Sequence, residues 1–305
     1  MQRIKSTLSA PLLVVVVYTL LLLSRYIPLD SLMFKDNIYL SMIILQVMIF
    51  ILPGIFYCKI RGKSVTDNLR LKMISPSKIW FVFSCFGVLV FGSTLINTAT
   101  FYWFKGAGQY SLYDTYVPGG SGWTDIVYVV IAFAVLPAIT EEFIFRGVLL
   151  SEYSDYGVGI AIVASAMMFS MLHFNLSQFF IYFYCGIVVA YAVYVTGSLL
   201  SAVLLHLLNN VYAIFFESVL WDVIKAPNSI IFFLFVVATL FMVFLVLSFN
   251  SAENILYTAG IKGEKSPPEA QKRVGGIKLV IETFLSPSFL ACVIFFLAVT
   301  LAVKK

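Results

Sequence analysis

The chain has 305 residues, of which 61% are hydrophobic and only 11% are charged. Ordinary soluble domains contain about 45–50% apolar residues, so this excess predicts a polytopic membrane protein. The 20 Lys and Arg residues exceed the 15 Asp and Glu residues, but they fall in short segments between apolar stretches, where basic residues orient a membrane chain. This distribution argues against a nucleic-acid partner and makes membrane lipids the expected surroundings.

Nine apolar windows approach the length of about 20 residues that a helix needs to cross a bilayer. They are 9–27, 38–58, 79–100, 126–150, 158–174, 177–197, 199–216, 229–249 and 284–303. The first is longer than the core of a signal peptide, which predicts that it is retained. Because 158–174, 199–216 and 284–303 are short or interrupted, the sequence predicts an all-α fold with about eight to nine transmembrane helices.

Positive charge is distributed unequally between the segments that connect these windows. Segment 59–78 contains six Lys or Arg residues and segment 250–283 contains five. The segments expected on the other side contain fewer basic residues, namely Arg25, Lys35, Lys105, Lys225 and Lys304-Lys305. Since cytoplasmic loops carry the excess of positive charge, the sequence predicts a multi-pass cell-membrane protein with its N-terminus in the cytoplasm.

Ionisable residues inside the apolar windows are the strongest indication of function. The two histidines, His173 and His206, lie there, and so does the acidic pair Glu141-Glu142. A charged residue at the centre of a membrane helix costs about 2.5–3.5 kcal/mol even on insertion scales, so it is rarely kept without a partner or a task. Glu142 and Arg146 share a helix face and are expected to pair, whereas Glu141 points about 100° away and remains available.

Polar groups on three predicted helices can meet at one point. Pro137 disrupts its helix one turn before Glu141, which favours a kink beside a water-filled cavity. His206 and Asn210 lie four residues apart on one face, whereas Asn209 is expected to serve packing or capping. A carboxylate, two imidazoles and an amide suffice to hydrolyse an amide bond, because they supply a base, an acid and donors for the oxyanion.

Other interpretations of these residues remain open. Glu142 with Arg146 fits a structural bridge equally well, and His206 with Asn210 fits an interhelical hydrogen-bond pair. The whole set also fits a proton-coupled transporter or a non-catalytic membrane scaffold. The absence of inverted repeats and the clustering of the groups favour a hydrolytic site over a permeation path.

Three motifs in this order resemble those of a known family. They are Glu-Glu-x-x-x-Arg at 141–146, Phe-x-x-x-His at 169–173 and His-x-x-x-Asn at 206–210. The pattern resembles the CAAX-protease and bacteriocin-processing family of intramembrane proteases, also called CPBP or Abi, which includes the CAAX prenyl protease 2 type. The resemblance covers about residues 120–216.

The resemblance implies a glutamate-dependent endopeptidase, with an all-helical membrane fold and a conical chamber that opens toward the cytoplasm. The catalytic residues that it implies are Glu141, His173, His206 and Asn210. Glu141 would activate water together with His173, and His206 and Asn210 would stabilise the oxyanion. The supporting residues would be Glu142 and Arg146, which orient the site, and Phe169, which packs behind His173.

A metal cofactor is a separate question. Glu141, His173 and His206 would form an adequate zinc ligand set with one position open for water. However, the compact His-Glu-x-x-His helix of zincins is absent from the sequence, and an asparagine one turn from His206 fits oxyanion binding better than zinc ligation. The sequence therefore predicts a site without a cofactor, with zinc as the alternative.

The resemblance also divides the chain into three parts. Residues 1–119 would hold the first three helices and an aromatic interfacial loop, and residues 120–216 would form the catalytic core. Residues 217–305 would hold the C-terminal helices and a flexible cytoplasmic linker at 262–276. The implied partner is a lipidated or hydrophobic peptide presented from the cytoplasmic side, either a prenylated CAAX protein or a peptide of bacteriocin processing and immunity. The four cysteines are expected to be packing residues.

Overall fold

The computed structural model is helical and contains no strand in the parts of the chain that it describes. Those parts are residues 5–27, 38–62, 71–103, 122–216, 219, 221–223, 230–261 and 276–303. The predicted loop at 101–125 falls mostly outside these residues, and the predicted linker at 262–276 falls almost wholly outside them. The all-α, polytopic fold predicted from the sequence is confirmed.

The N-terminal helices are α1 (Ser6–Ser24), α2 (Ile38–Gln46), η2 (Val47–Ile51), α3 (Leu52–Arg61) and α5 (Pro76–Trp103). One long segment follows, made of α7 (Trp123–Val130), η3 (Ile131–Val135), α8 (Leu136–Glu142), η4 (Phe143–Leu149), α9 (Leu150–Tyr153) and η5 (Ser154–Tyr156). The remaining helices are α10 (Val158–Leu172), α11 (Phe179–Thr196), α12 (Leu199–Phe215), α14 (Ile230–Ile261), α15 (Gly276–Phe284) and α16 (Pro287–Val303).

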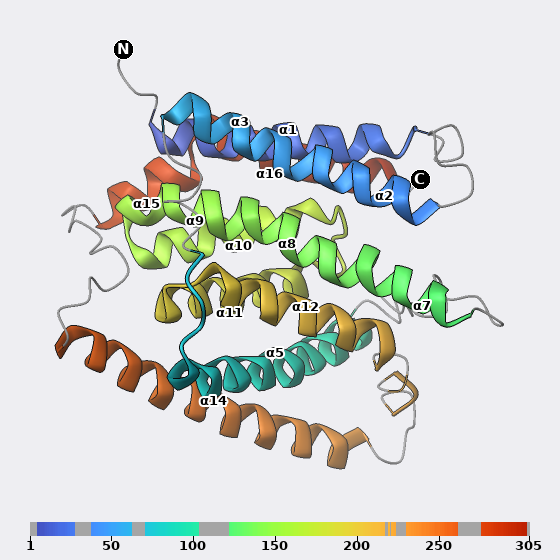
Figure 1. The fold of residues 1–305 in the computed structure, drawn as a ribbon, viewed down its shortest axis with the longest axis vertical. Helices are drawn as coiled ribbons and strands as arrows, with labels where there is room; N and C mark the ends of the chain where they lie inside the picture. The colour runs from blue at the N-terminus through green and yellow to red at the C-terminus, as the bar shows by residue number, and fades with distance from the viewer. Residues whose placement is uncertain are drawn as a thin grey trace.

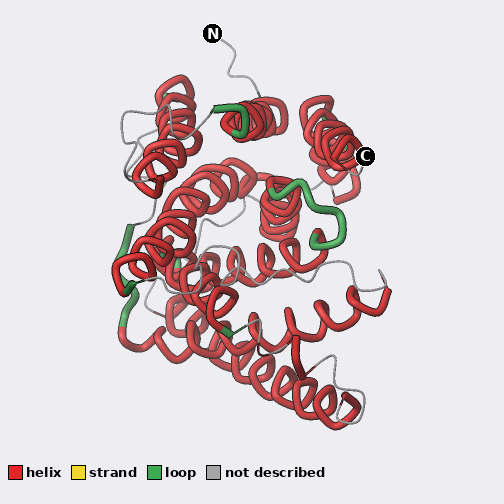
Figure 2. The backbone as a smooth tube through the Cα atoms, turned by 90° about the vertical axis from the view of Figure 1, so that its right-hand side faces the viewer, coloured by secondary structure: helices red, strands yellow, loops and turns green. Residues whose placement is uncertain are grey.

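The helices run roughly side by side, so that successive turns gather at two opposite ends of the bundle (Figure 1). Helix α5 packs mainly on α14, α10 packs on α11, and α1 packs on α16. Both views place the first and the last helices at the same edge of the bundle (Figures 1 and 2). The segment from α7 to α9, together with α10, α11 and α12, occupies the interior of this arrangement (Figure 1).

The number of membrane spans differs from the prediction. Among the described residues, six helical segments are long and apolar enough to cross a membrane, and a seventh is added if α15 and α16, bent by 50°, count as one span. Helices α10 and α12 coincide with two predicted windows but have only 15 and 17 residues. The predicted count of eight to nine spans is therefore not confirmed, because these two central helices fall short of spanning length.

The predicted disruption at Pro137 takes the form of a wide helical turn. The π-helix η3 directly precedes α8, which contains Pro137 in its first turn, and a second π-helix, η4, begins directly after Glu142. Proline lacks an N–H group and crowds the carbonyl four residues earlier, and a π-turn is one way in which a helix accommodates such an irregularity. The segment Trp123–Tyr156 still forms one span.

Side-chain hydroxyls tie the interior helices together. Tyr18 of α1 donates to the carbonyl of Met168 on α10 at 2.5 Å, and Tyr184 of α11 donates to that of Val88 on α5 at 2.6 Å. Ser165 of α10 donates to Phe145 in η4 at 2.7 Å. Each bond satisfies a polar group that would otherwise be unpaired in an apolar interior. All four cysteines are free and buried, which agrees with their predicted packing role.

Helices α10 and α11 approach each other closely at Gly186. A Cβ atom added there would lie 2.9 Å from the Cβ atom and 3.0 Å from the Cα atom of Ala166. By contrast, a Cβ atom added at Gly159 of α10 would have no atom within 4 Å. The small residue therefore sets the separation of the two helices that carry His173 and its neighbours.

We expect Gly186→Ala to destabilise the protein by about 1–3 kcal/mol, because overpacking forces the backbone or neighbouring side chains to move. Gly159→Ala is the matched control and should leave stability unchanged or raise it slightly, since Ala is the better helix former. Thermal unfolding of the detergent-solubilised variants would measure the difference. Equal melting temperatures for both variants would contradict the packing argument.

Candidate functional site

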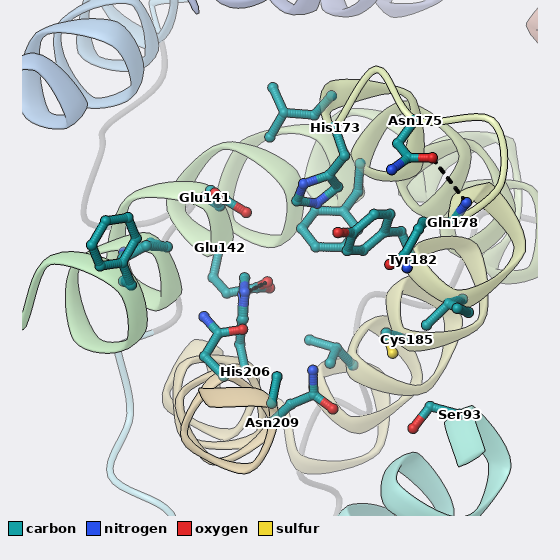
Figure 3. A pocket seen from close by; sticks show the side chains of 18 of the residues that line it. Ser93, Glu141, Glu142, His173, Asn175, Gln178, Tyr182, Cys185, His206 and Asn209 are labelled. Carbon is teal, nitrogen blue, oxygen red and sulfur yellow. Dashed lines mark hydrogen bonds and ion pairs between the residues drawn. The ribbon is translucent and has the colours of Figure 1, made fainter. Parts of the chain in front are cut away.

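A cavity of about 570 Å³ lies inside the bundle between the segment from η3 to η4 and helices α10, α11 and α12. Parts of α1, η2 and α5 complete its wall. The seven residues predicted to form the site all line it: Glu141, Glu142, Arg146, Phe169, His173, His206 and Asn210. Figure 3 shows that labelled side chains from separate helices point into one common space.

The carboxylate of Glu142 joins its own helical segment to α12. Its Oε1 atom accepts a hydrogen bond from Nη1 of Arg146 at 2.7 Å, which confirms the predicted pair. The same oxygen lies 2.8 Å from Nδ1 of His206 on α12. Because an ionised carboxylate only accepts hydrogen bonds, Nδ1 is the donor. His206 is therefore held in one orientation, with Nε2 left for another partner.

Arg146 makes two further contacts that hold it in place. Its Nη2 atom donates to the carbonyl oxygen of Gly186 on α11 at 3.1 Å. Its guanidinium carbon lies 4.5 Å from the centre of the Phe169 ring on α10, a geometry that gives a favourable cation–π interaction. The buried arginine thus connects η4 to α11 and α10 and neutralises Glu142.

Phe169 packs against both imidazole rings. The centre of its ring lies 5.3 Å from that of His173 and 5.7 Å from that of His206, with interplanar angles of 85° and 88°. Edge-to-face contacts of this kind restrict ring orientation. Phe169 therefore fixes the relative position of two histidines that come from different helices.

His173 lies at the end of α10, where the chain reverses. Phe174 follows with a φ angle of 48°, a left-handed conformation that ends the helix. Ser170 donates to the carbonyl oxygen of Phe179 at 2.6 Å and ties the end of α10 to the start of α11. This reversal places Tyr182 of α11 in a stack on His173, with ring centres 3.7 Å apart and 17° between planes.

Glu141 and His173 carry buried atoms that have no protein partner. Glu141 is 9% exposed, and neither its Oε2 atom nor Nε2 of His173 makes a hydrogen bond within the described structure. Leaving a buried polar atom unsatisfied costs about 1–3 kcal/mol. Since both residues line the cavity, its contents, water or substrate, are the available partners for these groups.

Several polar residues of the cavity wall were not singled out by the sequence motifs. Asn209 lines the cavity beside Asn210, although the sequence predicts a packing or capping role for it. Figure 3 shows Asn209 and Tyr182 among the inward-pointing side chains. The other polar lining residues are Arg25, Gln46, Ser93, Asn97, Asn175 and Gln178. Amide side chains inside apolar windows, such as Gln46 and Asn97, are the sequence signal that would have identified part of this wall.

The residues predicted for a zinc alternative do not form a ligand cluster in the described part of the chain. Within those residues, no group of three or more His, Cys, Asp or Glu side chains is arranged to hold a metal ion. His206 directs Nδ1 to Glu142, and His173 is stacked on Tyr182. No zinc site of Glu141, His173 and His206 is therefore preformed among the described residues.

Residues 123–212 match the family described as Rce1-like, type II CAAX prenyl endopeptidase. This part of the chain, less than a third of its length, is similar to that family. The match includes all seven predicted site residues and lies within the predicted core of residues 120–216. No curated protein and no solved structure matches the chain. The apolar helices make this a multi-pass membrane protein, and the family that residues 123–212 resemble is one of proteases.

We expect Arg146→Ala to lower the stability of the protein by about 3–5 kcal/mol, because it leaves Glu142 as an unpaired charge in the interior. Arg25→Ala is the control, since Arg25 also lines the cavity but is exposed, and it should change stability by no more than about 0.5 kcal/mol. Thermal unfolding in detergent would measure both. An Arg146→Ala variant as stable as the wild type would show that the pair contributes little to the fold.

Proposed function

We propose that the protein is an intramembrane endopeptidase that hydrolyses a peptide bond in a membrane-anchored or hydrophobic peptide. The observation that carries the proposal is the pairing pattern inside the cavity. Oε1 of Glu142 is bonded to both Arg146 and His206, whereas Oε2 of Glu141 and Nε2 of His173 have no protein partner, and Oε2 of Glu142 has none either. A structural ion-pair network alone would not need the second carboxylate and the second imidazole.

In this proposal, Glu141 acts as the general base. Its carboxylate accepts a proton from a water molecule that is held between Glu141 and Nε2 of His173. The hydroxide attacks the carbonyl carbon of the peptide bond and forms a tetrahedral intermediate. Proton transfer of this kind typically contributes a factor of about 10²–10⁴ to the rate.

His206 and Asn210 would stabilise the negative oxygen of the intermediate. In this step His206 acts as the imidazolium, with Nδ1–H bonded to Glu142 and Nε2–H presented to the oxyanion. Asn210 adds an amide N–H donor from the next turn of α12. Fixed donors aimed at a developing charge in a water-poor site give large rate effects. Glu142 and Arg146 act through His206 and are positioning residues.

Glu141 would then pass its proton to the leaving nitrogen as the C–N bond breaks. The products are a new carboxyl terminus and a new amino terminus, and Glu141 returns to its ionised form. Taken together, Glu141, Glu142, Arg146 and protonated His206 carry no net charge, which limits the cost of placing them at membrane depth.

We expect Glu141→Gln, His173→Ala and His206→Ala each to abolish cleavage while the protein remains folded. The amide of Gln cannot take a proton from water, and the histidine variants remove a water-positioning group or an oxyanion donor. Purified protein would be reconstituted with a library of membrane-anchored peptides, and products would be identified by mass. Elution as a single folded species in gel filtration is the control. Full activity of Glu141→Gln would reject the mechanism.

Asn210→Ala should reduce kcat by about 10²–10³, which is the usual cost of removing one oxyanion donor. Asn209→Ala is the matched comparison, because it removes the same amide from the adjacent position of α12 and from the same cavity. We expect a smaller effect there. If Asn209→Ala loses the activity and Asn210→Ala retains it, the two roles are exchanged.

Cleavage should continue in the presence of a chelator, because the proposed steps use only protein groups and water. Activity would be followed after dialysis against a zinc chelator and after zinc is added back. Loss of activity that zinc restores would instead assign Glu141, His173 and His206 as ligands. Chelated Glu141→Gln protein provides the background rate.

A further inference from the structure

The π-turn before Pro137 leaves one backbone carbonyl without a helical partner. The N–H of Leu136 bonds to the carbonyl oxygen of Ile131, five residues earlier, as in a π-helix. In this register the N–H of residue 137 would bond to the carbonyl of Ala132, but proline has no N–H group. Since Ala132 is buried, its carbonyl oxygen needs a donor from outside its own helix.

Gln46, the last residue of α2, supplies this donor. Its Nε2 atom donates to the carbonyl oxygen of Ala132 at 3.3 Å, and α2 packs on η3 and α8. A carbonyl oxygen accepts hydrogen bonds and does not donate them, so the amide nitrogen of Gln46 faces Ala132 and the amide oxygen faces away from it. The missing N–H of Pro137 thus fixes the direction of a side chain on another helix.

The amide oxygen of Gln46 is left without a partner. Oε1 is buried and accepts no hydrogen bond within the described structure, and Gln46 lines the catalytic cavity. Phe50, Phe133 and Pro137, which are close in sequence to Gln46 or Ala132 and line the same cavity, have no side-chain donor. An unsatisfied acceptor in such apolar surroundings is costly. The contents of the cavity are the source of a donor that the described residues leave for it.

A peptide substrate brings donors of one kind whatever its sequence. In a helix the main-chain N–H groups are bonded internally, whereas a segment that unwinds to expose the cleaved bond frees them. An apolar, membrane-anchored peptide has few side-chain donors, so its main-chain N–H groups are the donors that it offers, and they need acceptors where water is scarce. A water molecule can bond to Gln46 when no substrate is present, and the peptide then displaces it.

We propose that Gln46 is a substrate-binding residue, whose Oε1 atom accepts a main-chain N–H of the peptide. Gln46 lies outside residues 123–212, which match the family, and this role rests on the peptidase function proposed above. Ala132 precedes Glu141 by nine residues, or about 13 Å at the rise of an α-helix. Since an extended peptide spans about 3.3–3.6 Å per residue, the bonded N–H lies about four residues from the cleaved bond. Gln46 therefore selects an extended main chain and no particular side chain.

Substrates in which one amide is replaced by an ester test this contact, because the ester keeps the shape of the peptide and removes a single N–H. A cleaved apolar peptide would be made with an ester at each position in turn, except at the cleaved bond. In the wild type, we expect an ester about four residues from that bond to raise KM about 3- to 10-fold, the usual effect of one neutral hydrogen bond. If no ester there raises KM, the contact does not exist.

The Gln46→Met variant identifies the protein side of the contact. Methionine keeps the length of the side chain and removes both amide groups, so the ester that raises KM in the wild type should have no further effect in this variant. The difference between the two proteins isolates the Gln46 contact. Gln178→Met is the matched control, since Gln178 lines the same cavity, and there the ester effect should persist. The same ester profile in the wild type and in Gln46→Met would overturn the proposed contact.

Gln46→Met also removes the donor to Ala132, so its folding would be checked by thermal unfolding in detergent. Gln46→Asn takes its place if Gln46→Met does not fold. Asparagine keeps an amide but is shorter by one methylene, so it cannot reach Ala132 and the substrate together, and the ester effect should again be lost. An undiminished ester effect in Gln46→Asn would count against the contact. The ester series on the wild type needs no variant and decides the matter if neither one folds.

Equilibrium binding separates this contact from the peptidase function. Fluorescently labelled peptides and their esters would be titrated with Glu141→Gln protein in detergent, with and without Gln46→Met. A loss of affinity at one ester position that Gln46→Met cancels supports the contact even if no peptide is cleaved, and then only the peptidase function fails. Peptides that bind with no dependence on Gln46 overturn the contact and leave the peptidase function intact. If peptides are neither bound nor cleaved, both proposals fail.

Discussion

The site depends on one buried carboxylate oxygen. Oε1 of Glu142 receives hydrogen bonds from Arg146, four residues along its own segment, and from His206 on α12. A buried charge with two charge-assisted bonds is stable where a single charge would not be. Since Arg146 also contacts Gly186 and Phe169, this oxygen connects four helical segments. The bond to Glu142 orients the His206 ring directly. Arg146 contacts Phe169, and Phe169 in turn packs against the His173 ring.

Placement of the two histidines follows from that bridge and from aromatic packing. His206 is fixed through Nδ1 by Glu142, and His173 is held between Phe169 and Tyr182. Neither arrangement uses Glu141, which keeps a carboxylate oxygen without a protein partner. Glu142 also keeps one unpaired oxygen, Oε2, but its Oε1 is held by Arg146 and His206. In the proposed function, this difference makes Glu142 a positioning residue and leaves Glu141 for the chemistry.

Local sequence patterns predicted the contacts that form within one helix, and they missed those that depend on how helices meet. The Glu142–Arg146 pair follows from a four-residue spacing, whereas the bond to His206 joins positions 64 residues apart. The stack of Tyr182 on His173 depends on the reversal after α10, which no periodicity specifies. Pro137 indicated a disruption, but only the backbone shows that a π-turn accommodates it. Apolar windows located α10 and α12, whose short lengths reflect their interior position.

The two π-helical turns that flank α8 also bear on how such a site arises. A π-turn holds one residue more than the α-helical turn it replaces, and each residue of a helix rotates the chain by about 100°. The extra residue in η3 therefore changes the direction in which the later side chains of this segment point around the helix axis. Glu141 and Glu142 of α8 are among them. Removal of one residue from η3 would rotate Glu141 and Glu142 by about 100° around the helix axis and present a different face of the segment to the bundle interior.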